Sequence, residues 1–367
     1  MLSYTSLRTL YGQFTNNTTS ANLTNGDLYI NNSLRQIYSS APWDFLEIPV
    51  VDFTVAGTGT GTITSSGLTV TGAGTVFLSQ VKAGDSILAG NQIQIVTSVT
   101  SDTVLTTRVA FSPVIPALST FQNRRQFYGL PNDYDKLVAV TIQIGSVQYI
   151  PREVADKTTW DFLNQNTNIT SNIPAYFFIL DNKIGFYPTP SSGGNSINYT
   201  YRKKVRDLGV ADYVTGTIAS IANGASAVVG AATSWTTQMI GRFIRITRTN
   251  AVASGDGDWY PIIAVGSGTA LTLGRPYAGT TLALATAAYA ISEVPALPET
   301  YQMMPVYGAS VWYWNANGNP QKAKYYKEMY DSMMMQLRAD RLSKTTDDSI
   351  KDIVGGAMQN PNLYVMN

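Results

Sequence analysis

The 367-residue chain contains no cysteine and no histidine. Without histidine it cannot form a Ser-His-Asp or Cys-His catalytic arrangement, and it lacks the commonest general base. Without cysteine it has no disulfide, no thiolate nucleophile, and no zinc or iron–sulfur site of the usual ligand type. Glycoside hydrolysis, which needs only two carboxylates, stays open on composition alone. We expect a protein that is not an enzyme and that uses no cofactor.

Charged side chains are scarce. They make up 13% of the chain, which is about half of the ~25% found in average proteins. Lys and Arg number 25 and Asp and Glu 24, so the net charge is +1. This balance argues against a protein that binds polyanions with its whole surface. A hydrophobic content of 44% excludes disorder. The composition fits a surface that neighbouring subunits cover, or alternatively a β-rich globular protein with an uncharged polar surface.

Long apolar runs are also missing. No stretch of 18 apolar residues occurs, so we expect no membrane span. The first residues, Met1 to Leu10, lack the basic start and apolar run of a secretory signal.

Apolar residues at helical spacing predict helices near both ends of the sequence. For the second helix, Thr24 and Asp27 form a weakened capping box, and Pro42 marks its end. For the last helix, Asn319 precedes Pro320, a typical N-cap followed by proline at the first helical position. The helices are expected over about residues 7–14, 24–41, 304–316 and 320–344.

Two blocks rich in Thr, Ser, Gly and Val, residues 54–122 and 214–292, resemble each other. Their matching segments occur in the same order, which favours a duplicated module over chance similarity. Short alternating segments between Gly-containing turns predict a small antiparallel barrel or sandwich in each copy. The clearest matches are Gly61-Thr-Ile63 with Gly216-Thr-Ile218, Val70-Thr-Gly-Ala-Gly-Thr75 with Val228-Val-Gly-Ala-Ala-Thr233, and Val99–Thr106 with Val265–Thr272.

Between these blocks lies a different β region. Strands are expected at Leu137–Ile144 and Val147–Ile150 around a Gly145-Ser146 turn, with a helix over residues 151–166. A second hairpin turns at Asp181-Asn182. The predicted fold class is α+β: a helical bundle and a mostly antiparallel β region, with two inserted all-β modules related as a repeat. The expected parts are a frame (1–53, 123–213 and 293–345), the modules 54–122 and 214–292, and a tail, 346–367.

Several short motifs occur in the frame in a characteristic order. They are Ser33-Leu-Arg-Gln-Ile-Tyr38, Ala41-Pro-Trp-Asp-Phe-Leu46, Leu130-Pro-Asn-Asp-Tyr-Asp135, Ile173-Pro-Ala-Tyr-Phe177, Ile184-Gly-Phe-Tyr-Pro-Thr-Pro190, Tyr199-Thr-Tyr-Arg202 and Leu297-Pro-Glu-Thr-Tyr301. In this combination the chain resembles the head-to-tail adaptor proteins of tailed bacteriophages, including the tail tubular protein A group. The two β modules depart from the shortest members of that group and look like insertions.

The resemblance implies a structural protein of the virion neck, assembled in the host cytoplasm. Adaptors of this group form rings, usually of twelve subunits, between the portal and the tail. Such a ring continues the DNA channel, so the implied partners are further copies of the chain, the portal protein, a downstream tail or nozzle protein, and genomic DNA in passage. The alternative is a tail-associated decoration or receptor-binding protein that uses its β modules for glycans; it would expose aromatic pockets and form trimers.

Two groups of residues are candidate contacts. The basic run Arg202, Lys203, Lys204 and Arg206 is expected either to touch DNA or an acidic partner, or to be a solvated strand end. The pair Arg124-Arg125 carries the same two interpretations with less support. In the tail, Ile353, Leu363, Tyr364 and Val365 are expected to dock on the portal, as adaptor C-termini often do; disorder is the alternative.

Other motifs predict no site. Ser254-Gly-Asp-Gly-Asp258 resembles the start of a calcium loop, but Ser267 stands where an EF-hand needs a carboxylate, so a surface turn is expected. Gly57-Thr-Gly-Thr-Gly61 lacks the spacing of a dinucleotide-binding loop. We therefore predict no catalytic, cofactor or metal site.

Overall fold

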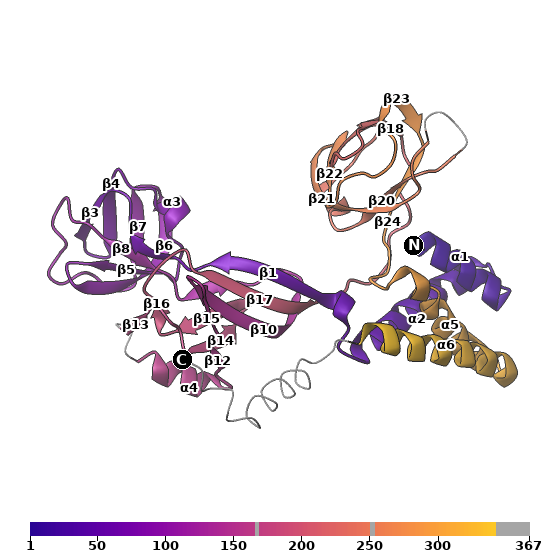
Figure 1. Ribbon diagram of the computed structural model, residues 1–367, viewed down its shortest axis with the longest axis horizontal. Helices are drawn as coiled ribbons and strands as arrows, with labels where there is room; N and C mark the ends of the chain where they lie inside the picture. Colours follow the sequence, from indigo (N-terminus) through magenta and orange to yellow (C-terminus); the bar gives the residue numbers. More distant parts are fainter. Residues whose placement is uncertain (166–168, 250–253, 343–367) are drawn as a thin grey trace, which may run out of the picture. The chain divides into compact units, whose positions relative to one another are not determined.

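The computed structural model describes residues 1–165, 169–249 and 254–342. The chain forms two compact units, whose elements are labelled in Figure 1. Unit 1 combines Met1–Leu46 with the chain from Val205 onward, and unit 2 comprises Glu47–Lys204. Helices and mostly antiparallel sheets make up the fold, which confirms the predicted α+β class. The predicted frame is distributed over both units, because its first segment, 1–53, runs from one into the other.

Unit 1 contains the four longest helices of the described chain. They are α1 (Tyr4–Thr15), α2 (Ser20–Ser39), α5 (Met304–Ala316) and α6 (Pro320–Arg341). Short 3₁₀ turns, η1 (Asp44–Leu46) and η3 (Glu299–Tyr301), flank them. Asn319 caps α6 by accepting a hydrogen bond from the Lys322 amide at 3.1 Å, as predicted.

The start of α2 was predicted wrongly. Its N-cap is Thr19, whose hydroxyl accepts from the Asn22 amide, so the helix begins well before Thr24. Asn17 holds Thr19 in place, because its side-chain oxygen accepts from the Thr19 amide at 3.1 Å and from the Thr19 hydroxyl at 2.8 Å. The hydroxyl of Thr24 instead donates to the Ser20 carbonyl inside the helix. A tight Asn17-to-Thr19 turn therefore outweighs the weaker capping pattern downstream.

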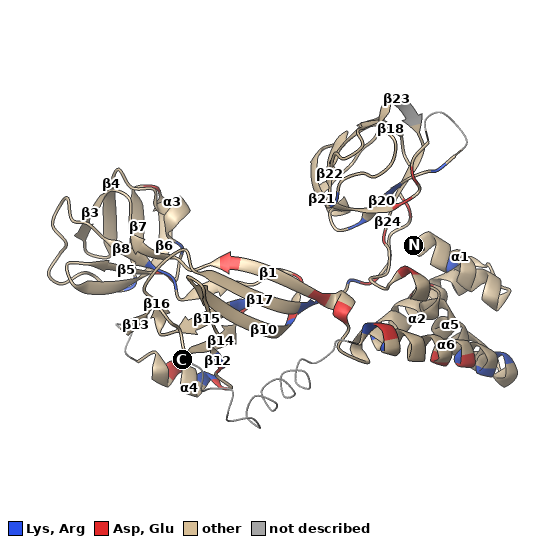
Figure 2. Cartoon of the chain, viewed as in Figure 1, with Lys and Arg blue, Asp and Glu red and all other residues tan. Residues whose placement is uncertain are grey.

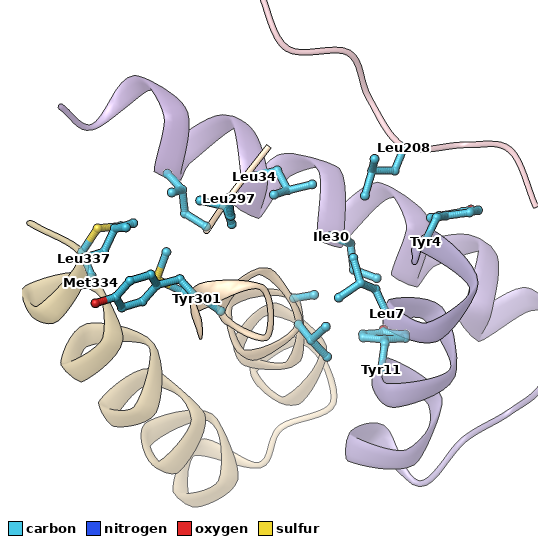
Figure 3. Close-up of a cluster of buried hydrophobic side chains, with 14 of the residues drawn as sticks. Tyr4, Leu7, Tyr11, Ile30, Leu34, Leu208, Leu297, Tyr301, Met334 and Leu337 are labelled. Atoms are coloured by element: carbon cyan, nitrogen blue, oxygen red, sulfur yellow. The ribbon is translucent and has the colours of Figure 1, made fainter. Parts of the chain in front are cut away.

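One apolar cluster holds these helices together, and Figure 3 shows its side chains converging from separate segments of the chain. Helix α5 contains no charged residue and contacts α1, α2 and α6, so its uncharged composition is that of a central helix. The α5–α2 contact is close: a Cβ on Gly308 would lie 2.2 Å from the Ser33 hydroxyl oxygen. Burying each large apolar side chain of this cluster stabilises the unit by about 1.5–3 kcal/mol.

Unit 2 contains two small sheets that pack on a shared apolar cluster. The first has the order β1-β17-β10-β11 and is antiparallel throughout; the second has the order β12-β14-β15-β9. Their strands are β1 (Glu47–Phe53), β9 (Phe127–Gly129), β10 (Tyr134–Ile144), β11 (Val147–Tyr149), β12 (Arg152–Glu153), β14 (Tyr176–Leu180), β15 (Lys183–Tyr187) and β17 (Ser196–Lys203). A short parallel pair, β13 (Thr170–Ser171) and β16 (Thr189–Pro190), lies beside them.

The helix predicted over residues 151–166 is shorter than expected. Arg152 and Glu153 form β12, which pairs in parallel with β14, and the helix α4 spans only Lys157–Leu163. Asp156 sets its start, because its carboxylate accepts a hydrogen bond from the Thr159 amide at 2.8 Å. Strand pairing with a distant segment therefore decides the conformation of these residues against the local helical pattern.

Each predicted β block folds as one seven-stranded antiparallel sheet. The first module has the order β2-β8-β5-β6-β7-β4-β3, and the second β23-β18-β19-β22-β21-β20-β24. The first comprises β2 (Ala56–Thr58), β3 (Thr62–Ser66), β4 (Thr69–Ala73), α3 (Phe77–Gln80), β5 (Ser86–Ala89), β6 (Gln92–Ser101), β7 (Val104–Thr107) and β8 (Gln122–Arg124). The second comprises β18 (Thr217–Ile221), β19 (Ala227–Ala231), η2 (Thr237–Met239), β20 (Phe243–Ile246), β21 (Trp259–Ser267), β22 (Ala270–Leu273), β23 (Leu282–Ala287) and β24 (Tyr289–Ser292).

Six strands of the first module correspond to six strands of the second. They follow one another in the same order along the chain, and they lie in the same order across the sheet: β3-β4-β7-β6-β5-β8 in the first module and β18-β19-β22-β21-β20-β24 in the second. Equivalent hydrogen bonds accompany them: the Thr75 hydroxyl donates to the Asp102 carbonyl at 2.6 Å, and the Thr233 hydroxyl donates to the Gly268 carbonyl at 2.6 Å. The modules differ in their seventh strand, since β2 lies beside β8 whereas β23 lies beside β18.

In both modules the chain enters and leaves at neighbouring positions. In the first, β2 pairs with β8. In the second, Tyr213 and Ile291 exchange backbone hydrogen bonds of 2.8 Å. Each module therefore joins the rest of its unit through a paired stalk of backbone.

Candidate interaction surfaces

Charged residues are unevenly distributed along the chain. Figure 2 shows Lys, Arg, Asp and Glu concentrated on α6, whereas the module strands are mostly uncharged. On α6 they form pairs one turn apart, such as Lys327 with Asp331 and Lys324 with Glu328. Pairs of this kind are solvated and contribute a few tenths of a kcal/mol each. Because the module strands carry few charged residues, they provide few basic side chains that could bind a polyanion.

The predicted basic run is divided between the two units. Arg202 and Lys203 end β17 and are half-buried, and Lys204 follows them exposed. Arg202 lies opposite Glu47 on one neighbouring strand and Lys136 on the other. Arg206 is exposed and belongs to unit 1, because the boundary between units falls after Lys204. The structure thus brings three of the four residues together at a strand end, and a contact with DNA or an acidic partner stays a prediction.

Arg125, the second basic candidate, is committed to an internal contact. Its Nε and Nη2 donate to the two carboxylate oxygens of Asp85 at 2.9 and 2.8 Å. The side chains of Arg125 and Asp85 are 11% and 4% exposed. Burial by itself lowers the pKa of Arg125, but the hydrogen bonds and charge of Asp85 outweigh it and raise that pKa above its ordinary value. The pair therefore stabilises the base of the first module and is not free to bind phosphate.

The residues predicted to dock on the portal, Ile353, Leu363, Tyr364 and Val365, lie outside the described part of the chain.

In the Ser254–Asp258 segment, the Asp256 carboxylate accepts hydrogen bonds from two residues close in sequence. One oxygen of Asp256 accepts from the Asp258 amide at 3.1 Å, and the other accepts from the Tyr260 hydroxyl. Burial and this second hydrogen bond raise the pKa of Tyr260 to about 12. Across the described residues, no three Asp or Glu side chains gather in a way that could hold a metal ion.

A cleft of about 350 Å³ lies at the base of the first module. Its lining includes Gln80, Asn123 and Arg125, but no aromatic side chain. The glycan-binding alternative predicts aromatic pockets on the modules. This cleft does not meet that expectation.

A larger groove, of about 460 Å³, lies in unit 2 between β10 and the β12–β14 pair. Tyr134 and residues 136–141 of β10 form one wall, and Ile150, Phe177 and Ile179 contribute to the other. Sequence reasoning missed this groove, because it depends on two strand edges that come together only in the folded unit. Its apolar residues Val138 and Ile150 are 49% and 79% exposed, which only the folded structure shows.

None of the described helices is long and apolar enough to cross a membrane.

Residues 104–239 match the family model of the SU10 adaptor protein. The matched segment begins at β7 of the first module, contains most of the central β region with the groove, and ends at η2 of the second module. It is just over a third of the chain. The match supports a phage adaptor protein, a structural component of the virion that contacts other proteins of the phage head or tail. No curated protein matches the chain.

Proposed function

We propose that this chain forms a ring between the portal and the tail of a phage particle and continues the channel through which DNA leaves the head. The observation that carries the proposal is the SU10 adaptor match over residues 104–239. It agrees with the order of the frame motifs, which resembles that of the head-to-tail adaptor proteins. The finer assignment to the tail tubular protein A group belongs to the same proposal.

A ring built from one kind of subunit uses two different surfaces of each copy, which meet head to tail. Charged residues are depleted in the buried centre of such interfaces. The scarcity of charge in this chain, 13%, fits a subunit with two covered flanks. We propose a dodecamer, as in the adaptors that the chain resembles.

The architecture supports a further part of the proposal. The four long helices form a bundle in the adaptor frame, and the two β modules are copies of one ancestral insertion. The shared order of six strands supports the duplication, as do the equivalent hydrogen bonds of Thr75 and Thr233. A paired entry and exit is the geometry expected of an insertion, because it leaves the parent fold intact.

In this proposal the protein works without catalysis. The portal binds the residues after α6, including Ile353, Leu363, Tyr364 and Val365, and a downstream tail or nozzle protein binds the opposite side of the ring. DNA passes through the channel without lasting contact, and Arg202, Lys203, Lys204 and Arg206 are the residues that would meet it or an acidic partner. Assembly takes place in the host cytoplasm, and the mature location is the neck of the virion.

The mass of the purified protein, measured alone and with purified portal protein, tests this proposal. We expect a species of about twelve subunits that associates with the portal. A variant truncated after Leu342 should keep its fold and bind the portal less tightly. A trimer that ignores the portal and binds surface glycans would contradict the proposal, and would favour the receptor-binding alternative.

A further inference from the structure

The groove beside β10 combines three features that recur where an extended peptide adds to a sheet. These are an open strand edge, apolar walls, and charged groups that form no ion pair with any residue that the structure describes. Each is visible in the contacts of unit 2.

The open edge belongs to β10. One side of this strand pairs with β17 along most of its length, whereas β11 covers only Ile142–Ile144 on the other side. Residues 136–141 therefore present an edge with no strand along it. The facing strand β12 is also an edge strand, the first in its sheet. Arg152 and Val154 direct their amides to β14, so the backbone groups of Glu153 between them point the other way.

Apolar side chains line the space between these edges. Val138 is the extra residue of a bulge, because Leu137 and Ala139 face consecutive residues of β17 and leave it without a partner. Bulges redirect side chains and are frequent next to functional sites. Ile150 and Ile179 complete an apolar lining, and Ile150 is 79% exposed in the free chain.

Two opposite charges at the groove form no ion pair with any residue that the structure describes. Lys136 and Glu153 both line it and are both exposed. A segment that carries an acidic residue near Lys136 and a basic residue near Glu153 would complement both.

We infer that this groove binds an extended segment of another protein of the virion, which adds as a strand along β10 and places alternate apolar side chains between Val138, Ile150 and Ile179. Main-chain hydrogen bonds supply the affinity in this mode of recognition, and the side-chain pockets supply the specificity. The inference rests on the proposed function, because an adaptor must hold the protein next to it. The groove lies within the segment that matches the SU10 adaptor family, residues 104–239.

A second copy of this chain is a poorer occupant. Each described strand already pairs on at least one side, and β1, the other edge of the same sheet, carries Pro49 near its centre. Proline lacks an amide hydrogen and blunts an edge against strand addition. In the chain's own tail, residues 343–352 carry charges of both signs but only one large apolar side chain, Ile350. Residues 353–367 carry apolar side chains but no charged one. Neither stretch combines alternate apolar residues with charges that complement both Lys136 and Glu153. The occupant is therefore a different protein.

Hydrogen exchange on the full chain, measured alone, with portal protein and with the downstream tail protein, tests this inference. One of the two partners should slow amide exchange across residues 136–141 and at Glu153. Val138→Asp should weaken binding of that partner at least about tenfold, because it places a carboxylate between apolar walls. Val147→Asp is the matched control, since Val147 is 50% exposed on the same sheet and does not line the groove.

Lys136→Glu gives a second, milder variant, and should weaken the same partner while leaving the fold unchanged. Unchanged affinity in both groove variants, or no protection of β10 by either partner, overturns the inference. In that case the proposed function is still tested separately, by the mass of the ring that the purified protein forms. A wild-type chain that forms no ring and binds neither protein would instead contradict the proposed function itself. A ring whose formation, rather than partner binding, is lost in Val138→Asp would assign the groove to a second copy and overturn the inference.

Discussion

Arg125 and Asp85 form a two-pronged, buried ion pair at the base of the first module, with N–O distances of 2.9 and 2.8 Å. The backbone around Arg125 adds to this contact. Its amide donates to the Val55 carbonyl at 2.8 Å, and its carbonyl accepts from the Tyr128 hydroxyl at 3.1 Å. One arginine therefore ties the entry strand, the interior and the exit strand of the module together.

Breaking this pair from one side should strongly destabilise unit 2. We expect Arg125→Met to lower the free energy of unfolding by about 3–5 kcal/mol, because it leaves the buried Asp85 carboxylate without an opposite charge. Among the described residues, only the Lys82 amide and the Asn123 side chain then donate hydrogen bonds to it. Adding Asp85→Asn to Arg125→Met should recover part of the loss, since the amide is neutral. Urea denaturation of the three proteins measures the effect.

The matched control is Lys157→Met in the Lys157–Asp161 pair, whose side chains are 62% and 58% exposed. An exposed pair of this kind contributes less than about 1 kcal/mol. If Arg125→Met costs no more than Lys157→Met, the buried pair is not what fixes the base of the module.

A second prediction compares equivalent turns of the two modules. Gly74 has a φ of 65°, and Ala232 holds the same left-handed conformation with a φ of 55°. A side chain costs about 1–2 kcal/mol there, whereas a new glycine costs about 0.4–1 kcal/mol in unfolded-chain entropy. We expect Gly74→Ala to lower the melting temperature and Ala232→Gly to raise it slightly. A Gly74→Ala variant that melts higher than the wild-type chain, or an Ala232→Gly variant that melts lower, would contradict the equivalence of the two turns.

Local chemistry explains which elements could be predicted from the sequence. Turns at Gly145-Ser146 and Asp181-Asn182 both join antiparallel strands, and the latter two residues have φ values of 48° and 55°, which Asp and Asn tolerate. The N-cap at Asn319 could be predicted in the same way, from the residues around it. In each case the residues that decide the structure are neighbours in sequence. The tail residues 346–367 and the division into frame and modules stay predictions.

Contacts between distant segments explain what could not be predicted. From the sequence alone, Arg125 could be interpreted only as one of two surface arginines, because its partner Asp85 lies 40 residues away in sequence.

The second module shows that the fold of the sheet does not by itself produce an ion pair at this place. There the register of β20 and β24 places Arg242 and Glu293 at the corresponding positions. Glu293 accepts instead from the Gly209 and Val210 amides at 2.6 and 3.0 Å. The sequence shows that a charged residue stands at each of these positions, but it does not show which group that residue contacts in the folded chain.

A third prediction concerns pH. Burial and the hydrogen bond to Asp256 raise the pKa of Tyr260 to about 12, from an ordinary value of 10.0. The folded state thus favours the neutral phenol. Its contribution to stability is fully present below pH 10 and is lost as the pH rises toward 12. We expect the urea midpoint to fall over this range, and to fall less steeply in Tyr260→Phe.

Tyr325→Phe is the control for this measurement, because Tyr325 is 55% exposed. Its profile should follow that of the wild-type chain. A Tyr260→Phe profile that is equally steep would show that other groups account for the alkaline loss of stability.

The last prediction uses the paired stalk of the second module. Asp212 and Ser292 face each other across it, and the Ser292 hydroxyl donates to the Asp212 carboxylate at 2.6 Å. Replacing residues 214–291 with a short Gly-Ser linker should therefore leave the helices of unit 1 folded, because the two ends are already adjacent. The helical signal in circular dichroism should persist, with cooperative melting. Loss of that signal would mean that the module completes the helical core, and that it is not an insertion into a fold that stands without it.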